Sequence, residues 1–212
     1  LSPPKKPTRK KLTMNNPVLG YLFLRVILVW LALSMAGFFW GNGFASTMTP
    51  FYEFVTEAAS TDYVAAISVQ ERQEASIVLA ATAIRAKQIS PSRALPAGTT
   101  ISSDITVLHT LVPLIIFLMI ILCWPIKSWQ HSGWIVLFAI PSFFCISAVT
   151  APIQLLGLLE MGFQNAANQA GFAREESFAL KWMLLTEGGG RWLIPALFGL
   201  ACGAISEKMI KK

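Results

Sequence analysis

Charged residues are scarce in this sequence of 212 residues, since Asp, Glu, Lys and Arg make up only 13% of it, against about 25% in an average soluble domain. Hydrophobic residues make up 54%, and the mean hydropathy is +0.57. This composition excludes a disordered or collagen-like chain. It also argues against a soluble globule, because so few charges cannot cover its surface. We therefore expect an integral membrane protein.

Cysteine and histidine are equally sparse. The three cysteines, Cys123, Cys145 and Cys202, all lie in apolar runs, so the sequence excludes a disulfide framework and predicts free thiols that pack as small hydrophobic side chains. The two histidines, His109 and His131, are expected on opposite faces of the membrane. A metal site needs several converging ligands. We therefore predict no cofactor and no metal.

Long apolar runs dominate the rest of the chain. A membrane-spanning helix needs about 20 mostly apolar residues. The run 191–206 is short and reaches across only if Gly188–Gly190 belong to its helix, or if the bilayer thins there. We predict an all-α membrane protein with four transmembrane helices, at residues 17–40, 105–124, 134–159 and 191–206.

Lysine and arginine set the direction of these spans, because cytoplasmic loops carry an excess of them. Both ends of the chain, 1–16 and 207–212, are rich in lysine, and the turn 125–133 carries Lys127. With both ends inside, Glu207 is the single acidic residue on the cytoplasmic side. We predict a bacterial inner-membrane protein with both termini in the cytoplasm. The basic residues serve topology, so we expect no nucleic acid partner.

Two segments are predicted outside the bilayer. Residues 41–104 form an extracytoplasmic segment that we expect to be partly helical, with a helix over 63–88 that Asp62 caps. Residues 160–190 form a second loop with an amphipathic helix over 174–186. Together they predict a small helical cap on one membrane face.

The last span carries two glycine features. Gly199 and Gly203, with Ala196 upstream, give the spacing that lets two helices approach closely, so we expect this span to pack against another span or a partner chain. Gly188, Gly189 and Gly190 precede Arg191. This run either turns the chain into the membrane, which we favour, or binds an anionic group beside the guanidinium.

Other polar residues leave two further functions open. Glu187, Arg191 and His109 are all expected near the outer surface, where they would form the site of a membrane enzyme. Pro113, Pro141 and Pro195 interrupt three spans, as in transporters with broken helices. Arg25, one third of the way into the first span, is expected to reach back to the cytoplasmic interface.

The order of these parts resembles the small bacterial membrane proteins known as exosortase H-associated. The residues that carry the resemblance are spread over most of the chain, namely Leu111–Leu114, Gln154, Glu176–Leu180 and Leu193–Pro195. The Gly188–Gly190 run and the long outer segment depart from that pattern. The resemblance implies a non-catalytic companion of an envelope-sorting protease, whose catalytic residues have no counterpart here.

These observations predict a non-enzymatic accessory or structural subunit of a multi-protein complex in the bacterial inner membrane. Its partners would be the lipid bilayer and other membrane-protein subunits, in a hetero-oligomer. The alternatives are a small oligomeric transporter or channel component, and a membrane enzyme with an outer-face site.

Overall fold

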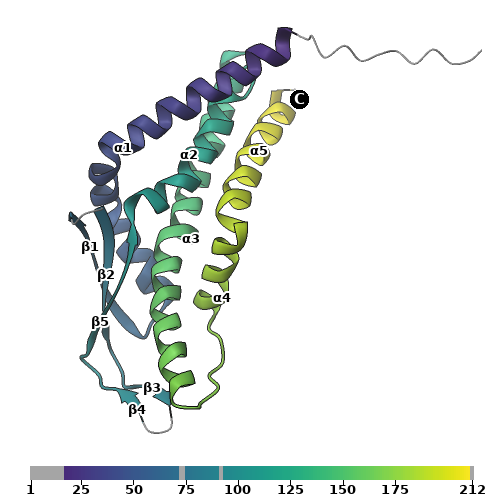
Figure 1. The fold of residues 1–212 in the computed structure, drawn as a ribbon. Helices are drawn as coiled ribbons and strands as arrows, with labels where there is room; N and C mark the ends of the chain where they lie inside the picture. The colour runs from purple at the N-terminus through teal and green to yellow at the C-terminus, as the bar shows by residue number, and fades with distance from the viewer. Residues whose placement is uncertain (1–16, 72–74, 91–92, 211–212) are drawn as a thin grey trace, which may run out of the picture.

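A computed structural model describes residues 17–71, 75–90 and 93–210 (Figure 1). The chain is mostly helical, as expected, but it also contains strands. In chain order the elements are α1 Pro17–Ala59, β1 Tyr63–Glu71, β2 Ala75–Ala83, β3 Lys87–Ser90, β4 Arg93–Leu95, β5 Thr100–Thr106, α2 Val107–Cys123, α3 Trp129–Gln169, α4 Phe178–Leu185, the wide helical turn η1 Thr186–Gly190, and α5 Arg191–Ile210.

Helix α1 is far longer than the span predicted at 17–40. It has 43 residues, or roughly 65 Å at 1.5 Å per residue, about twice the hydrocarbon thickness of a bilayer. The helix bends part-way along (Figure 1) and continues through Pro50. Proline has no N–H to give to the carbonyl of Ser46. The hydroxyl of Thr49 donates to that carbonyl instead, at 2.8 Å, which keeps the turn satisfied.

A three-stranded antiparallel sheet in the order β1-β2-β5 replaces the helix predicted over 63–88. That prediction was wrong. In β2, Ile77, Leu79 and Ala81 are fully buried, while Val78 and Ala80 are only partly buried. Burial with a period of two identifies a strand with one covered face. Residues 72–74, which the predicted helix also included, lie outside the described residues.

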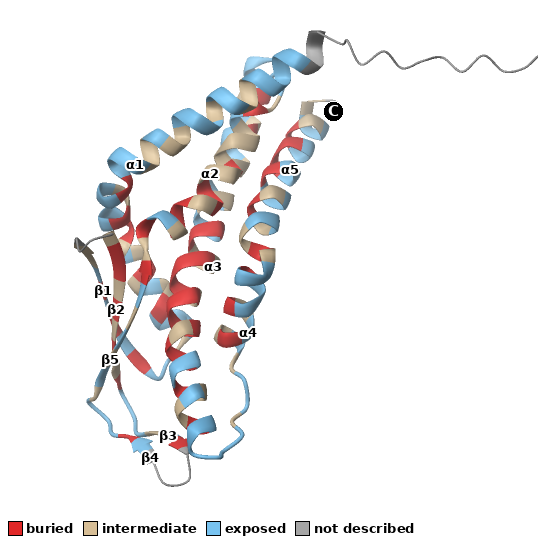
Figure 2. Cartoon of the chain, viewed as in Figure 1, coloured by how far each residue is buried: buried red, intermediate tan, exposed pale blue. Residues whose placement is uncertain are grey.

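The covered face of the sheet packs on the second halves of α1 and α3 and forms the larger hydrophobic core. Tyr52 of α1, Ile77 of β2 and Leu155 of α3 are among its fully buried side chains. Figure 2 shows buried residues along α3 and the strands, and exposed residues along the first part of α1. The sheet therefore packs on α1 and α3, two helices whose other halves belong to the helical bundle (Figure 1).

Within the described residues, three helices are long and apolar enough to cross a membrane, by length and composition alone. They are Gly20–Ala59, Trp129–Gln169 and Phe178–Ile210. The fourth predicted crossing is the shorter apolar helix α2, with 17 residues. Residues 105–106, predicted to open this span, belong to β5 instead. A fourth crossing therefore stays a prediction.

Helix α3 and the last helical run also differ in extent from the predictions. Helix α3 has 41 residues and continues through Pro141 and Pro152 to Gln169, so residues 160–169 are helix rather than loop. The chain passes from α4 to α5 through η1, where Gly189 has non-helical backbone angles, so Gly188–Gly190 form a kink between two helices. The start of α1 and the end of α5 lie at the same end of the molecule, and β3 and β4 lie at the other (Figure 1).

Candidate functional site

Three polar side chains meet on one carboxylate oxygen of Glu187, just before α5 begins. The Oε1 atom of Glu187 accepts hydrogen bonds from Nε2 of Gln154, at 2.5 Å, and from the guanidinium of Arg191. Nε2 of His109 lies 3.5 Å from the same oxygen. The four residues come from α2, α3, η1 and α5. The structure thus brings together the three residues of the predicted enzyme site and adds Gln154. We call these four residues the Glu187 cluster.

The glycine run explains how Glu187 is positioned. Gly189 has a φ of 120°, a conformation that glycine adopts without steric cost. At Gly190, a Cβ atom would lie 2.8 Å from the carbonyl oxygen of Leu185. Glu187 lies four residues before Arg191, and the two side chains pair across this turn. This geometry agrees with the interpretation of the run as a turn.

The charges of the Glu187 cluster are largely satisfied within the chain. The Arg191 side chain is only 13% exposed and faces the Glu187 carboxylate, so it is engaged rather than presented to an anion. His109 differs, because among the described residues its Nε2 atom has no hydrogen-bond partner, and 3.5 Å is too long for a good hydrogen bond. His109 is therefore the member of the Glu187 cluster whose buried polar atom is left without a hydrogen bond among the described residues.

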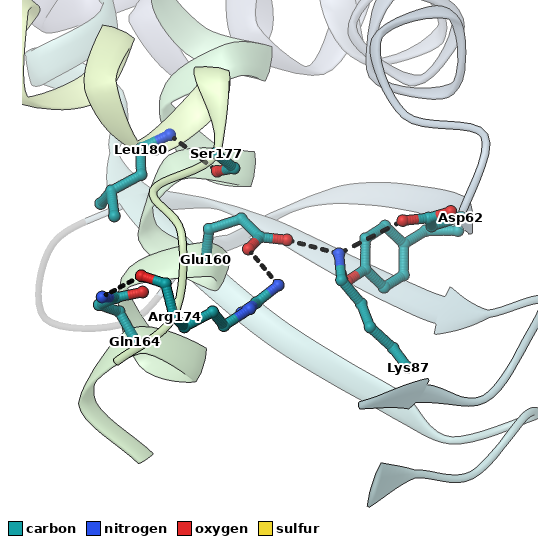
Figure 3. Close-up of polar contacts among 8 residues, drawn as sticks. Asp62, Lys87, Glu160, Gln164, Arg174, Ser177 and Leu180 are labelled. Atoms are coloured by element: carbon teal, nitrogen blue, oxygen red, sulfur yellow. Dashed lines mark hydrogen bonds and ion pairs between the residues drawn. The ribbon is translucent and has the colours of Figure 1, made fainter. Parts of the chain in front are cut away.

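A second polar cluster joins the sheet to α3 (Figure 3). The Glu160 carboxylate, on α3, accepts from Nζ of Lys87 at 2.6 Å and from Arg174 at 2.9 Å. Lys87 also donates to the Tyr63 hydroxyl, at 2.8 Å, and lies 3.3 Å from the Asp62 carboxylate. The side chain of Glu160 is only 10% exposed. Because two cations compensate it, this Glu160 cluster fixes the first strands and the α3–α4 loop to one point.

Electrostatics within the Glu160 cluster stabilise the charged lysine. Burial disfavours the charge of Lys87, but hydrogen bonds to Glu160 and Tyr63 outweigh burial, so the pKa of Lys87 is raised above its ordinary value. For the Tyr63 hydroxyl the main cause is different, because burial itself raises its pKa. Both side chains beside Glu160, Lys87 and Arg174, also lie within 6 Å of the Phe163 ring centre, at 5.6 and 5.4 Å. Cation–π attraction therefore adds to the ion pairs.

A small pocket of about 190 Å³ adjoins the Glu160 cluster. Ser60, Ser177 and Phe178 line it together with the cluster's own residues. The Ser177 hydroxyl accepts from the Leu180 amide, at 3.2 Å, and so caps α4. The polar groups that line this pocket are thus mostly hydrogen-bonded within the chain. Among the described residues no group of three or more His, Cys, Asp and Glu side chains could hold a metal ion.

The glycines predicted to pack the last span do so within the chain. A Cβ atom on Gly199 would lie 3.0 Å from Ile120, and one on Gly203 would fall well inside 3.0 Å of the Trp124 indole. The glycine spacing predicted packing against either another span or a partner chain. In the structure, the chain's own α2 and the Trp124 that follows it pack against these glycines. Ala196 is partly buried on the same helix.

The remaining residues singled out from the sequence have structural partners. Arg25 donates to the carbonyl of Leu122 at 2.7 Å, so it satisfies one of the last carbonyls of α2. His131 is fully buried; its Nδ1 accepts from the Lys127 amide, and its Nε2 lies 3.1 Å from the Ser206 hydroxyl. Cys123 and Cys202 are buried, whereas Cys145 is exposed.

Part of this site was missed from the sequence. Lys87 was expected within a helix and Arg174 at the start of another, and neither expectation brings them to Glu160. They lie 73 and 14 residues from Glu160 in the sequence, respectively. The available signal was Glu160 itself, an acid after a long apolar run that requires compensation if buried.

Comparisons with known proteins found no family model, no curated protein and no solved structure that matches this chain. The resemblance to exosortase H-associated proteins therefore stays a prediction. The function has to be argued from the geometry of the chain itself.

Proposed function

We propose that this protein is a non-enzymatic accessory subunit of a multi-protein complex in the bacterial inner membrane. Its lysine-rich ends would lie in the cytoplasm, and its sheet would lie in the outer compartment. The complex would be a hetero-oligomer in which this chain contributes spans to the bilayer and a small folded body outside it.

The observation that carries the proposal is that the carboxylates at the centre of both polar clusters are paired within the chain. Glu160 is compensated by Lys87 and Arg174, and Glu187 by Arg191 and Gln154. Removing the solvent from charged groups is costly unless they are paired, and here the pairing joins separate elements of one fold. These ion pairs therefore hold the helices and strands in fixed positions, as a structural subunit requires.

The first half of α1 supplies a surface for partner helices. In its most apolar window no residue is buried inside the chain, and only one side, which includes Gly37, contacts α2. Phe38, Phe39 and Trp40 are strongly exposed. Helices associate in membranes through close packing rather than hydrophobic exclusion, and such broad aromatic side chains offer a large contact area to a neighbouring subunit.

Site-specific photo-crosslinking in native membranes tests this proposal. A photoreactive residue at Phe38, which is 80% exposed, should crosslink to a distinct protein that also co-purifies in mild detergent. The matched control is Leu197 of α5, which is also exposed and should give lipid adducts only. Lipid adducts at both positions, together with a homogeneous homo-oligomer in detergent, would contradict the accessory role and favour transport.

The Glu187 cluster favours a second candidate function, a membrane enzyme with an outer-face site. Its specific support is the convergence of His109, Glu187 and Arg191 on one oxygen, with the buried Nε2 of His109 left without a hydrogen bond among the described residues. The variant His109→Gln distinguishes the two functions. It should leave the assembly of the complex unchanged if the cluster is structural, and it should abolish the activity of the native complex if His109 transfers a proton.

A further inference from the structure

The two edges of the sheet are treated differently. At the β1 edge, the Ala65 amide donates to Oε1 of Glu57 at 3.4 Å, and the Ile67 amide donates to Oε1 of Glu53 at 2.7 Å. Both carboxylates come from α1. An edge strand with free amides invites pairing with another chain. Here the helix beside it closes that edge with two side chains.

The β5 edge has no such closure. The amides of Ala65 and Ile67 point away from β2, so the even-numbered residues of β1 and β2 form the hydrogen bonds between these strands. The backbone N–H and C=O groups of the odd-numbered residues of β2 therefore point toward β5. The bond from the Ala83 amide to the Thr99 carbonyl, at 3.0 Å, agrees with this register. The backbone groups of Ser102 and Asp104 therefore point away from the sheet. Among the described residues, none forms a hydrogen bond with them.

Burial gives independent evidence that the β5 edge is open. On the covered face of the sheet, Ala65 and Ile67 of β1 are buried, although β1 is also an edge strand. The residues of β5 at the same level, Ile101 and Ser103, are half-buried, whereas further along the strand Ile105 is buried and its counterpart on β1, Val69, is half-buried. Asp104, on the other face, is exposed. Helix α3 lies against β5 through the bond from the Ser103 hydroxyl to the Leu155 carbonyl, at 2.9 Å, but Ser102 and Asp104 stay exposed, so this part of the β5 edge is accessible.

We infer that the β5 edge, Thr100–Thr106, accepts an extended segment of a partner protein as a fourth, antiparallel strand. Main-chain hydrogen bonds to Ser102 and Asp104 would supply the affinity, as in other cases of strand addition. Asp104 is the one charged residue of β5. Since opposite charges stabilise cross-strand pairs, the segment should carry Lys or Arg opposite Asp104.

A second copy of this chain does not fit the edge. Strands β1, β2 and β5 run roughly along the helices (Figure 1), and β5 leads directly into α2. Antiparallel pairing of β5 with itself would turn the second copy upside down in the bilayer. Parallel pairing across a symmetry axis along the strands would put each residue level with its equivalent, whereas parallel hydrogen bonds are slanted and staggered. The added strand therefore comes from a different protein.

A pocket at the end of β5 provides an anchor for the same segment. It has a volume of about 440 Å³ and is lined by Thr106, Val107 and Leu108, with Gly37 and Phe38 of α1 among the others. The first residues of an antiparallel segment would reach this end of β5. A large apolar side chain there would occupy part of the pocket and fix the register of the added strand.

The test uses the full-length protein in detergent and a labelled peptide probe with the sequence of β2, Ser76–Thr82, in which lysine replaces Val78. Val78 is the residue that pairs with Asp104 within the chain. Fluorescence anisotropy measures binding to the wild type, to Ser102→Pro and to the matched control Ser102→Ala. Proline removes the outward amide without breaking the pairing with β2. It should weaken binding about tenfold or more, while alanine should change binding less than about twofold.

Two further readouts keep the inference falsifiable if Ser102→Pro fails to fold. In the wild type, saturating peptide should slow hydrogen exchange at the Ser102 and Asp104 amides and leave the capped Ala65 amide unchanged. Asp104→Lys should prefer a peptide with glutamate at the lysine position. Absent binding, equal losses for Pro and Ala, or unchanged exchange at Ser102 would overturn the inference. That the added strand belongs to a partner subunit rests on the proposed accessory role. If the peptide binds but no native complex is found, the accessory role is refuted and the strand-accepting edge is not.

Discussion

Helix α5 packs against the end of α2 at Gly203, and substituting this glycine tests that contact directly. In Gly203→Ala, the new Cβ would fall well inside 3.0 Å of three atoms of the Trp124 ring, closer than real Cβ atoms approach. A rigid indole cannot yield at its far end, so α5 and the Trp124 segment must separate. Overpacking of this kind typically costs about 1–3 kcal/mol. The neighbouring Gly199→Ala should cost less, because its Cβ would lie 3.0 Å from the Ile120 side chain.

The matched control is Gly43→Ala in α1, where a Cβ atom would meet nothing within 4 Å. Alanine favours a helix over glycine by up to about 1 kcal/mol, so the control should be neutral or stabilising. Thermal unfolding in detergent measures the difference, at roughly 2–4 °C per kcal/mol for a chain of this size. Removing the ring in Gly203→Ala/Trp124→Leu should recover most of the loss. Equal melting temperatures for Gly203→Ala and Gly43→Ala would refute this packing.

Three further predictions concern the polar clusters and the glycine turn. Glu160→Gln leaves the cations of Lys87 and Arg174 without their compensating charge and should lower the free energy of unfolding by about 3–5 kcal/mol in chemical denaturation. Stability should hold up to about pH 10 and fall at higher pH, because the raised pKa values of Lys87 and Tyr63 mean that the folded state keeps its protons longer than the unfolded chain. Gly189→Ala forces a residue with a side chain to a φ of 120° and should cost about 1–3 kcal/mol.

Each of these predictions has a control. Asp62→Asn alters the exposed end of the Glu160 cluster and should cost at most about 1 kcal/mol, so an equal loss in both variants would contradict the role of Glu160. In Tyr63→Phe the alkaline loss should be smaller, and an unchanged pH profile would remove Tyr63 from the explanation. Gly188→Ala meets no atom within 4 Å. If it destabilises as much as Gly189→Ala, backbone strain is not the cause.

The helices were largely predictable because their signal is local. Apolar runs mark α2, α3, α5 and the first half of α1. The second half of α1 was missed, since residues 41–104 were assigned to an outer segment that follows a span at 17–40. The helix continues because Thr49 satisfies the carbonyl that Pro50 leaves free, and because its buried residues join the core beneath the sheet. Packing decided the outcome where local propensity was ambiguous.

The sheet was not predictable for a related reason. The stretch Ile77–Ala86 is rich in alanine and fits both a helical period and a strand period, and alanine favours helix locally. Strand pairing over distances such as Leu79 with Ser103 tips the balance. The Glu187 cluster shows the same division. Glu187 and Arg191 are four residues apart and pair locally across the Gly189 kink, whereas His109 and Gln154 arrive only through tertiary packing.

The account depends most on the sheet and the lysine-rich ends lying on opposite sides of the bilayer. Cysteines introduced at Ser102, in β5, and at Lys208, near the end of α5, test this with a membrane-impermeant maleimide, and the unmodified chain measures labelling of the native thiols. We predict that Ser102→Cys is labelled in intact spheroplasts and Lys208→Cys only after the membrane is permeabilised. Labelling of both positions in intact spheroplasts, or of Lys208→Cys alone, would contradict the account.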